Sequence, residues 1–256
     1  MFNSVSFIGA GRIARIMLGG WQRADALPSR ILVVDANPDA VAALQADYAE
    51  VIAATLDEAA QADLVFGALH PPALNEVLPL IAGALKPTAV FCSLAPKIKL
   101  AALQEKLAGF KRLARMNPNA PSIIGEGYNP VSFAPELPGP ARDDLLALLK
   151  PLGQSPEVDE RLLETYAVIS AMGPTYFGFQ FAEVERQAKS FGLDASAARA
   201  AMHAMLIGTV DTLFASDVPR DKALDLVPVR PMAEYEPDIV GMLQRQIGGI
   251  HAKLSS

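Results

Sequence analysis

Three small residues near the start of the chain have the spacing of a phosphate-binding turn. Gly9, Gly11 and Ala14 follow the apolar run 5–8 and open a segment with helical character. A glycine at the first position permits a tight turn, one at the second lets the backbone approach a pyrophosphate, and alanine at the third keeps the helix close to the sheet. The helix N-terminus offers unpaired N–H groups to the anion. The pattern predicts a dinucleotide-binding unit with contacts from Gly9, Ala10, Gly11, Arg12, Ile13 and Ala14.

An acid follows the second predicted strand. The β-branched run 31–34 is typical of a buried parallel strand, and Asp35 comes directly after it. A carboxylate roughly 20 residues beyond the glycines can bind both ribose hydroxyls and repels a 2′-phosphate, so Asp35 favours NAD slightly over NADP. The alternative is a turn or helix-capping aspartate, because Asn37-Pro38-Asp39 opens the next helix.

Two further loops follow predicted strands and point to the same crevice. The strand 63–69 runs into His70-Pro71-Pro72, and the strand 89–94 into Ala95-Pro96-Lys97. In an open α/β sheet the loops after the strands line the ligand crevice. We therefore predict cofactor contacts from Leu69, His70, Pro71 and Ala95. A surface histidine is the competing interpretation of His70.

Composition limits the classes of function. The 256 residues are 51% hydrophobic and carry a formal net charge of −6, which argues against a general nucleic-acid binder. The single cysteine, Cys92, lies in an apolar run and is interpreted as a buried hydrophobe. No predicted segment approaches a spanning helix or a secretory leader. The expectation is a cytoplasmic protein that binds a small molecule, with no membrane, nucleic-acid or metal partner.

The order of elements predicts an α/β fold in two parts. Strands and helices alternate six times with short connections, which predicts a Rossmann-type doubly wound parallel sheet over residues 1–157, with one or two edge strands in 122–133. Residues 158–256 have helical periodicity and predict an all-helical domain for substrate binding and dimerisation. Because three Ala-, Gly- and Met-rich helices enclose little volume, a homodimer interface is favoured over a monomer core.

The motifs together resemble the pyrroline-5-carboxylate reductase family over nearly the whole chain. The glycine turn matches, and so does the segment from Ala62 to Pro71, except that His70 replaces a lysine. The family's R-x-M-P-N-T-P and S-G-S-G-P-A-Y segments are matched by Arg115, Pro118, Asn119, Pro121, Ser170, Gly173, Pro174 and Tyr176. Asn117, Ala120, Ala171, Met172 and Thr175 depart from them.

The resemblance implies hydride transfer from NAD(P)H to the carbon–nitrogen double bond of a small cyclic imino acid, as in proline biosynthesis. It implies that Asn119 lies near the nicotinamide and that Ser170, Thr175 and Tyr176 lie near the substrate. One departure affects the substrate: the family's Ser-Pro-Gly-Gly-Thr-Thr stretch is replaced by the sequence 227–234, VPVRPMAE. Arg230 in that stretch could clamp a carboxylate. The alternative is a surface arginine paired with Glu234.

Two other functions fit the same residues. One is a dehydrogenase of another small carbonyl or hydroxy acid, for which Lys189 on a long helix is a weak candidate acid. The other is a non-catalytic dinucleotide-binding protein whose substrate site has been lost, as the missing Gly-Gly-Thr-Thr residues would allow. Cofactor binding combined with an imine-reduction assay distinguishes the three.

Overall fold

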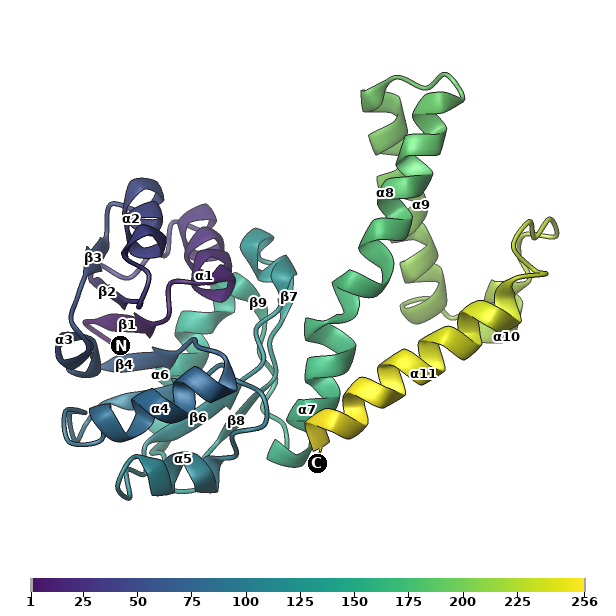
Figure 1. Ribbon diagram of the computed structural model, residues 1–256. Coiled ribbons are helices and arrows are strands. Elements are labelled where there is room, and N and C mark those ends of the chain that lie inside the picture. The colour runs from purple at the N-terminus through teal and green to yellow at the C-terminus, as the bar shows by residue number, and fades with distance from the viewer. Residues whose placement is uncertain (1, 256) are drawn as a thin grey trace. The chain divides into compact units, whose positions relative to one another are not determined.

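The computed structural model describes residues 2–255, which divide into two compact units (Figure 1). The first unit comprises residues up to 172 together with residues from 251 onward, and the second comprises 173–250. Among residues 2–255, no helix has the length and apolarity needed to cross a membrane.

A seven-stranded sheet forms the centre of the first unit. Its order is β3-β2-β1-β4-β5-β6-β8, and every pairing is parallel except the antiparallel edge pair β6–β8. A separate parallel pair joins β7 to β9. The strands are β1 Val5–Ile8, β2 Ile31–Val34, β3 Val51–Ala53, β4 Leu64–Gly67, β5 Val90–Ser93, β6 Leu113–Met116, β7 Gly127–Tyr128, β8 Val131–Phe133 and β9 Gly153–Gln154. The predicted Rossmann-type sheet is confirmed, and the stretch 122–133 contributes both β7 and the edge strand β8.

Helices cover both faces of this sheet and thereby bury its strands on both sides. One core contains Phe7, Trp21 and Phe66 and the helices α1, α2 and α6, whereas α3, α4 and α5 pack on the other face. The helices are α1 Arg12–Arg23, α2 Pro38–Asp47, α3 Leu56–Ala60, α4 Pro71–Ile81, α5 Leu100–Lys106 and α6 Gly139–Leu149. Short 3₁₀ turns span Ala120–Ile124, Lys150–Leu152 and Glu160–Leu162. The unit continues through α7 Leu163–Tyr166 and a π-helical turn, Ala167–Ala171.

The second unit is helical throughout. It contains α8 Gly173–Ser190, α9 Ala195–Phe214, α10 Arg220–Leu224 and most of α11 Glu236–Ser255. Within the described chain, Ala198 is the one buried residue of these four helices. The helical C-terminal region is thus confirmed as a class, and it has almost no interior of its own.

The division between the units differs from the expected boundary at 158. Residues 158–172 fall in the first unit, and both backbone and side-chain contacts join them to the sheet. Glu160 and Glu164 both form ion pairs with Arg115 of β6. A segment with helical periodicity is therefore joined to the first unit by ion pairs that periodicity alone does not reveal.

Candidate functional site

The predicted cofactor residues follow the carboxyl ends of neighbouring strands. Gly9–Gly11 come after β1, Asp35 after β2, Leu69–Pro71 after β4 and Ala95 after β5, and these strands are adjacent and parallel in the sheet. In such a sheet the carboxyl ends share one edge, which is where ligands bind. The fold therefore brings these residues to one side of the sheet.

The two glycines of the turn are required for different reasons. Gly9 has φ +116°, and a Cβ there would lie 2.6 Å from the carbonyl oxygen of Ala68. Gly11 has φ −77°, and a Cβ there would meet no described protein atom within 4 Å. The protein itself thus needs Gly9 but does not need Gly11. Close approach of a ligand phosphate is a physical reason for a glycine at the second position.

The N-terminus of α1 suits an anion. Within residues 2–255, no side chain forms a capping hydrogen bond at this end of the helix, and its first turn contains no acid. The first N–H groups of a helix lack intrahelical partners and carry the positive end of the dipole. Together with Gly11, this end fits the pyrophosphate of a dinucleotide.

Asp35 is hydrogen-bonded to the turn itself. Its carboxylate accepts from the backbone N–H of Ala10 at 2.7 Å and from that of Asn37 at 2.8 Å. The helix cap is supplied by Asn37, whose side chain accepts from the Asp39 N–H at 3.0 Å. Asp35 therefore shapes the glycine turn rather than capping α2. The segment 35–39, which leads into α2, contains two aspartates and no basic residue.

The loops after β4 and β5 differ in exposure. His70 is exposed and occupies the N-cap position of α4, followed by Pro71 at the first helical position. Ala95 is buried, and its N–H donates to the Ser93 hydroxyl at 3.3 Å. Among Leu69, His70, Pro71 and Ala95, His70 is thus the residue that offers a polar side chain to solvent.

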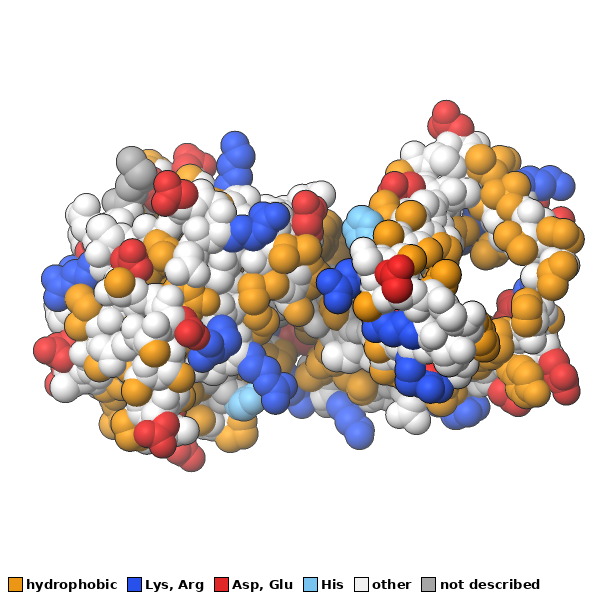
Figure 2. All heavy atoms as spheres, turned by 90° about the horizontal axis from the view of Figure 1, so that it is seen from above, with side chains coloured by type: hydrophobic (Ala, Val, Ile, Leu, Met, Phe, Trp, Pro, Cys, Tyr) orange, Lys and Arg blue, Asp and Glu red, His pale blue; other side chains and the backbone are white. Residues whose placement is uncertain are grey.

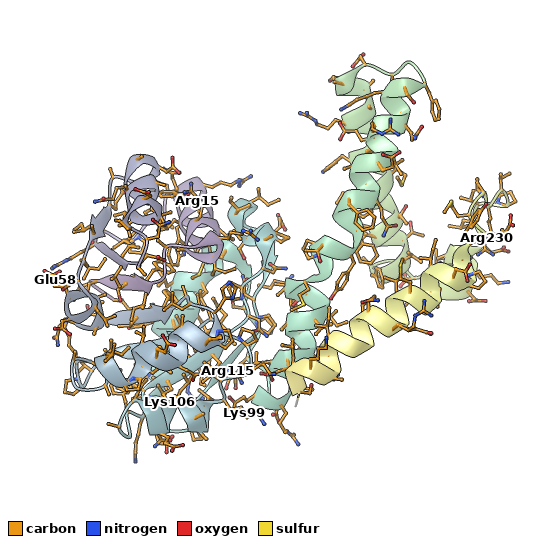
Figure 3. All side chains as sticks on the ribbon, viewed as in Figure 1. Arg15, Glu58, Lys99, Lys106, Arg115 and Arg230 are labelled. Atoms are coloured by element: carbon orange, nitrogen blue, oxygen red, sulfur yellow. The ribbon has the colours of Figure 1, made fainter. Side chains whose placement is uncertain are left out.

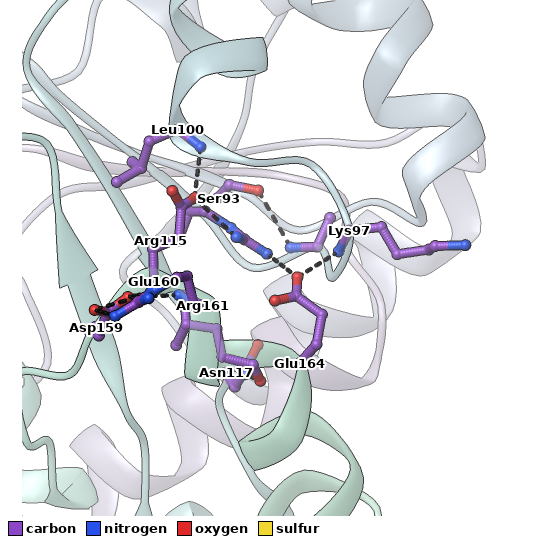
Figure 4. Close-up of polar contacts among 11 residues, drawn as sticks. Ser93, Lys97, Leu100, Arg115, Asn117, Asp159, Glu160, Arg161 and Glu164 are labelled. Carbon is purple, nitrogen blue, oxygen red and sulfur yellow. Dashed lines mark hydrogen bonds and ion pairs between the residues drawn. The ribbon is translucent and has the colours of Figure 1, made fainter. Parts of the chain in front are cut away.

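A buried ion-pair network contacts the loop that follows β5 (Figure 4). This network was not predicted from the sequence. Arg115 is 1% exposed. Its guanidinium donates to Glu160 at 2.8 Å and to Glu164 at 2.7 Å. The signal in the sequence was a cation inside the apolar strand LARM, since a buried arginine requires partners. The sequence does not reveal which acids those partners are.

Asn119 and Ser170 lie together in the first unit. The Asn119 side chain donates to the Ser170 carbonyl at 3.4 Å and accepts from the Tyr128 N–H at 3.0 Å. Ser170 lies on the π-helical turn, a feature that is frequent at functional sites, and its hydroxyl donates to the Tyr166 carbonyl at 2.8 Å. The Asn119 amide therefore holds β7 and the π-helical turn in place.

Two tyrosines, which belong to no motif recognised in the sequence, accompany this pair. The Tyr128 and Tyr166 rings have centroids 6.0 Å apart. Burial raises the pKa of the Tyr128 hydroxyl, and the charge and hydrogen bond of Tyr166 add to this effect. The Tyr128 phenol therefore stays protonated through the neutral range.

The other predicted substrate residues belong to the second unit. Thr175 is exposed, and Tyr176 is half-buried with a pKa raised by burial. Figure 3 shows Arg230 beside the start of α11, where it forms an ion pair with Glu236. The expected alternative partner, Glu234, is replaced by Glu236. Arg230 also lines a shallow pocket of about 230 Å³ with Met232, Ile239 and Val240.

Comparisons with known proteins agree with this architecture. Residues 4–96 match the family model described as NADP oxidoreductase, coenzyme F420-dependent. The pyrroline-5-carboxylate reductase of Escherichia coli (strain K12) is 28% identical over 194 residues, covering 75% of this chain and 72% of that protein. The Pseudomonas aeruginosa pyrroline-5-carboxylate reductase is 24% identical over 216 residues, covering 84% and 79%. The solved Plasmodium falciparum pyrroline carboxylate reductase with NADP bound has a TM-score of 0.78 at 16% identity, covering 98% of this chain and 95% of that one, which shows a shared fold.

Proposed function

We propose that this chain, a divergent member or relative of the pyrroline-5-carboxylate reductase family, is an NAD(P)H-dependent reductase of the carbon–nitrogen double bond in a small cyclic imino acid. The observation that carries the proposal is the turn after β1. No described protein atom would clash with a side chain at Gly11, so the fold does not require glycine there. Gly11 is also the N-cap residue of α1, whose first N–H groups donate no hydrogen bond to a capping side chain within the described residues. These are the requirements of a bound pyrophosphate.

The reaction needs little from the protein beyond position and charge. A bound nicotinamide supplies the hydride. A protonated imine accepts hydride at carbon without a strong protein acid, so the chain's task is to orient the two reactants. Because the Ser170 hydroxyl donates its proton to the Tyr166 carbonyl, its oxygen lone pairs are left to accept a hydrogen bond from the iminium N–H. Asn119 supports this arrangement by binding the Ser170 carbonyl.

The proposed cofactor is NAD(H) in preference to NADP(H). The Asp35 carboxylate accepts a hydrogen bond from the Ala10 N–H, and the segment 35–39 adds a second carboxylate, that of Asp39, and no basic residue. A carboxylate at this position binds ribose hydroxyls and repels a 2′-phosphate, whereas NADP sites typically supply an arginine.

The proposed anionic end of the substrate binds Arg230. The arginine side chain is 54% exposed, and it borders an apolar pocket of about 230 Å³. A guanidinium has five N–H donors in a planar fork. Arg230 can therefore bind a substrate carboxylate either alongside the Glu236 carboxylate or in its place. Thr175 and Tyr176 are the other residues that we assign to the substrate.

The second unit supports a proposed homodimer. Large apolar side chains on its helices are exposed, and Figure 2 shows many of them gathered on its surface. They include Phe177, Phe179, Phe181, Val184, Met205, Ile207, Val210 and Phe214. Monomeric proteins rarely expose such contiguous patches, and α8 and α11 have no buried residue. A second copy of this chain is the proposed cover, because like apolar surfaces match across a two-fold axis.

A single set of measurements tests the function. Quenching of NADH fluorescence reports cofactor binding, and NADH oxidation with a panel of cyclic imino acids reports turnover. We expect both. Turnover of keto or hydroxy acids alone would identify the dehydrogenase alternative. Binding without any turnover would identify the non-catalytic alternative, which the Arg230–Glu236 ion pair and the absent Gly-Gly-Thr-Thr residues favour.

A further inference from the structure

We infer that Glu164 is a positioning residue: it holds the loop 95–97 in a strained conformation that presents this loop to the cofactor. The inference deepens the proposed function, on which it rests for the role of Ala95. Its structural content lies entirely within the first unit, among β5, β6 and α7.

The first step in the argument is the strain. Lys97 has φ +71°, in the left-handed region that residues other than glycine seldom occupy. Such strain persists only where surrounding contacts enforce it, and it is concentrated at functional sites. The Lys97 side chain is exposed, so burial of that side chain does not enforce the conformation.

The second step is the contact that enforces it. The Lys97 N–H donates to Glu164 Oε1 at 3.2 Å, and the same oxygen accepts from Arg115 Nη2 at 2.7 Å. The start of α5 is held in the same way, since the Leu100 N–H donates to Glu160 Oε1 at 2.6 Å. Two carboxylates of the segment 160–164 thus bind backbone N–H groups within the loop that follows β5 and at the start of α5 (Figure 4).

The third step is the rigidity of the carboxylates themselves. Glu164 is 6% exposed, and Arg115 is 1% exposed. Charged hydrogen bonds in a buried setting have few alternative partners, so the position of Glu164 is fixed by β6. Arg115 on β6 therefore fixes the position of the Glu164 carboxylate, and this carboxylate fixes the backbone of the loop at Lys97. Glu164 also lies on α7, the helix that directly precedes the π-helical turn carrying Ser170, so the same network adjoins the proposed cofactor loop and the segment proposed to face the substrate.

The test separates positioning from general stability by relieving the strain. Glu164→Ala removes the acceptor, and Glu164→Gln keeps an oxygen at the same place without the charge. Lys97→Gly removes the penalty of the left-handed conformation. The matched control is Arg161→Gln, which breaks the neighbouring exposed pair with Asp159 and leaves the network intact. The readouts are the NADH dissociation constant and hydrogen exchange of the peptide containing residues 94–100.

We expect Glu164→Ala to weaken NADH binding by about tenfold and to accelerate exchange of this peptide, because a charged hydrogen bond is lost. Glu164→Gln retains part of the affinity, and Lys97→Gly in the Glu164→Ala background restores most of it without raising the unfolding temperature to that of the wild type. Arg161→Gln behaves as wild type. Wild-type affinity in Glu164→Ala, or a double variant as weak as Glu164→Ala, would overturn the inference.

The exchange measurement needs no cofactor. If the wild-type protein bound no NADH, the proposed function would fail, yet faster exchange of residues 94–100 in Glu164→Ala would still support the positioning of the loop. Unchanged exchange in that variant would overturn it whatever the cofactor result.

Discussion

At the scale of single residues, the proposed cofactor preference rests on Asp35 and the proposed substrate contact rests on Arg230. Asp35 and Arg230 were both selected from the sequence for their charge. The structure gives each of them a partner within the chain: Asp35 binds two backbone N–H groups, and Arg230 binds Glu236. A charged group that is already hydrogen-bonded within the chain affects both local geometry and ligand binding. Variants that keep its hydrogen bonds but remove its charge separate these two effects.

For Asp35, we expect the wild-type protein to bind NADH more tightly than NADPH. Asp35→Asn keeps a side-chain oxygen that can accept the Ala10 N–H but removes the charge, so the preference should fall by about tenfold as repulsion of the 2′-phosphate is lost. Fluorescence titration with both cofactors measures the ratio. Asp35→Ala serves as the comparison, since it also removes the hydrogen bonds to the turn. Tighter NADPH binding in the wild type would contradict the assignment.

For Arg230, the expected effect is on the substrate alone. Arg230→Ala should raise KM for an anionic imine by about one to two powers of ten, because a charge-assisted contact contributes roughly 1.5–3 kcal/mol. Arg230→Lys should recover little, since an ammonium lacks the planar fork. Steady-state kinetics with varied imine measure the change.

The control for Arg230 is its ion-pair partner. Glu236→Gln frees the guanidinium without removing it, so KM should stay the same or fall. Equal kinetics of Arg230→Ala and the wild type would show that this ion pair is only a surface contact, and the substrate carboxylate would then have another binding partner.

At the scale of an element, the strand–turn–helix unit separates the needs of folding from the needs of binding. Gly9→Ala should destabilise the protein strongly, because φ +116° is unfavourable for alanine and the Cβ would lie 2.6 Å from the Ala68 oxygen. Gly11→Ala should leave the unfolding temperature nearly unchanged but weaken NADH binding at least about tenfold, since the Cβ would enter the space needed by the phosphates.

Thermal unfolding and NADH titration of the two variants make this comparison. Loss of stability in Gly11→Ala, or retention of wild-type affinity by a folded Gly11→Ala protein, would show that the turn does not bind a dinucleotide in the proposed way. Gly9→Ala provides the matched case in which folding itself is affected.

At the scale of the whole molecule, the helical unit raises the question of assembly. Its helices expose Phe179 at 68% and similar residues on α8 and α9, and a protein with this surface should self-associate. We expect a dimer in sedimentation experiments at micromolar concentration. Phe179→Glu should weaken the dimer, because association would then bury a charge.

A matched variant tests whether this effect is local. Leu80 of α4 is 66% exposed, but it belongs to the first unit, so Leu80→Glu should sediment as the wild type does. A wild-type protein that is a stable monomer and still reduces an imine would remove the dimer from the proposal.

The sequence by itself determined the features that depend on neighbouring residues. The glycine turn, the alternation of buried strands and helices, and the helical character of the C-terminal region were all predicted, and the fold class is confirmed. Each follows from local chemistry: a parallel strand buried on both faces is a short apolar run, and a turn with positive φ needs glycine at a fixed offset from the strand.

Only the tertiary structure decided the features that depend on distant partners. Arg115 binds acids 45 and 49 residues away, and this pairing helps to join the segment 158–172 to the first unit. The left-handed Lys97, the hold of Asp35 on the glycine turn and the choice of Glu236 by Arg230 likewise depend on which groups folding brings within hydrogen-bonding distance. A single sequence shows which charges must find partners, but the partner is chosen by the packing of elements that lie far apart along the chain.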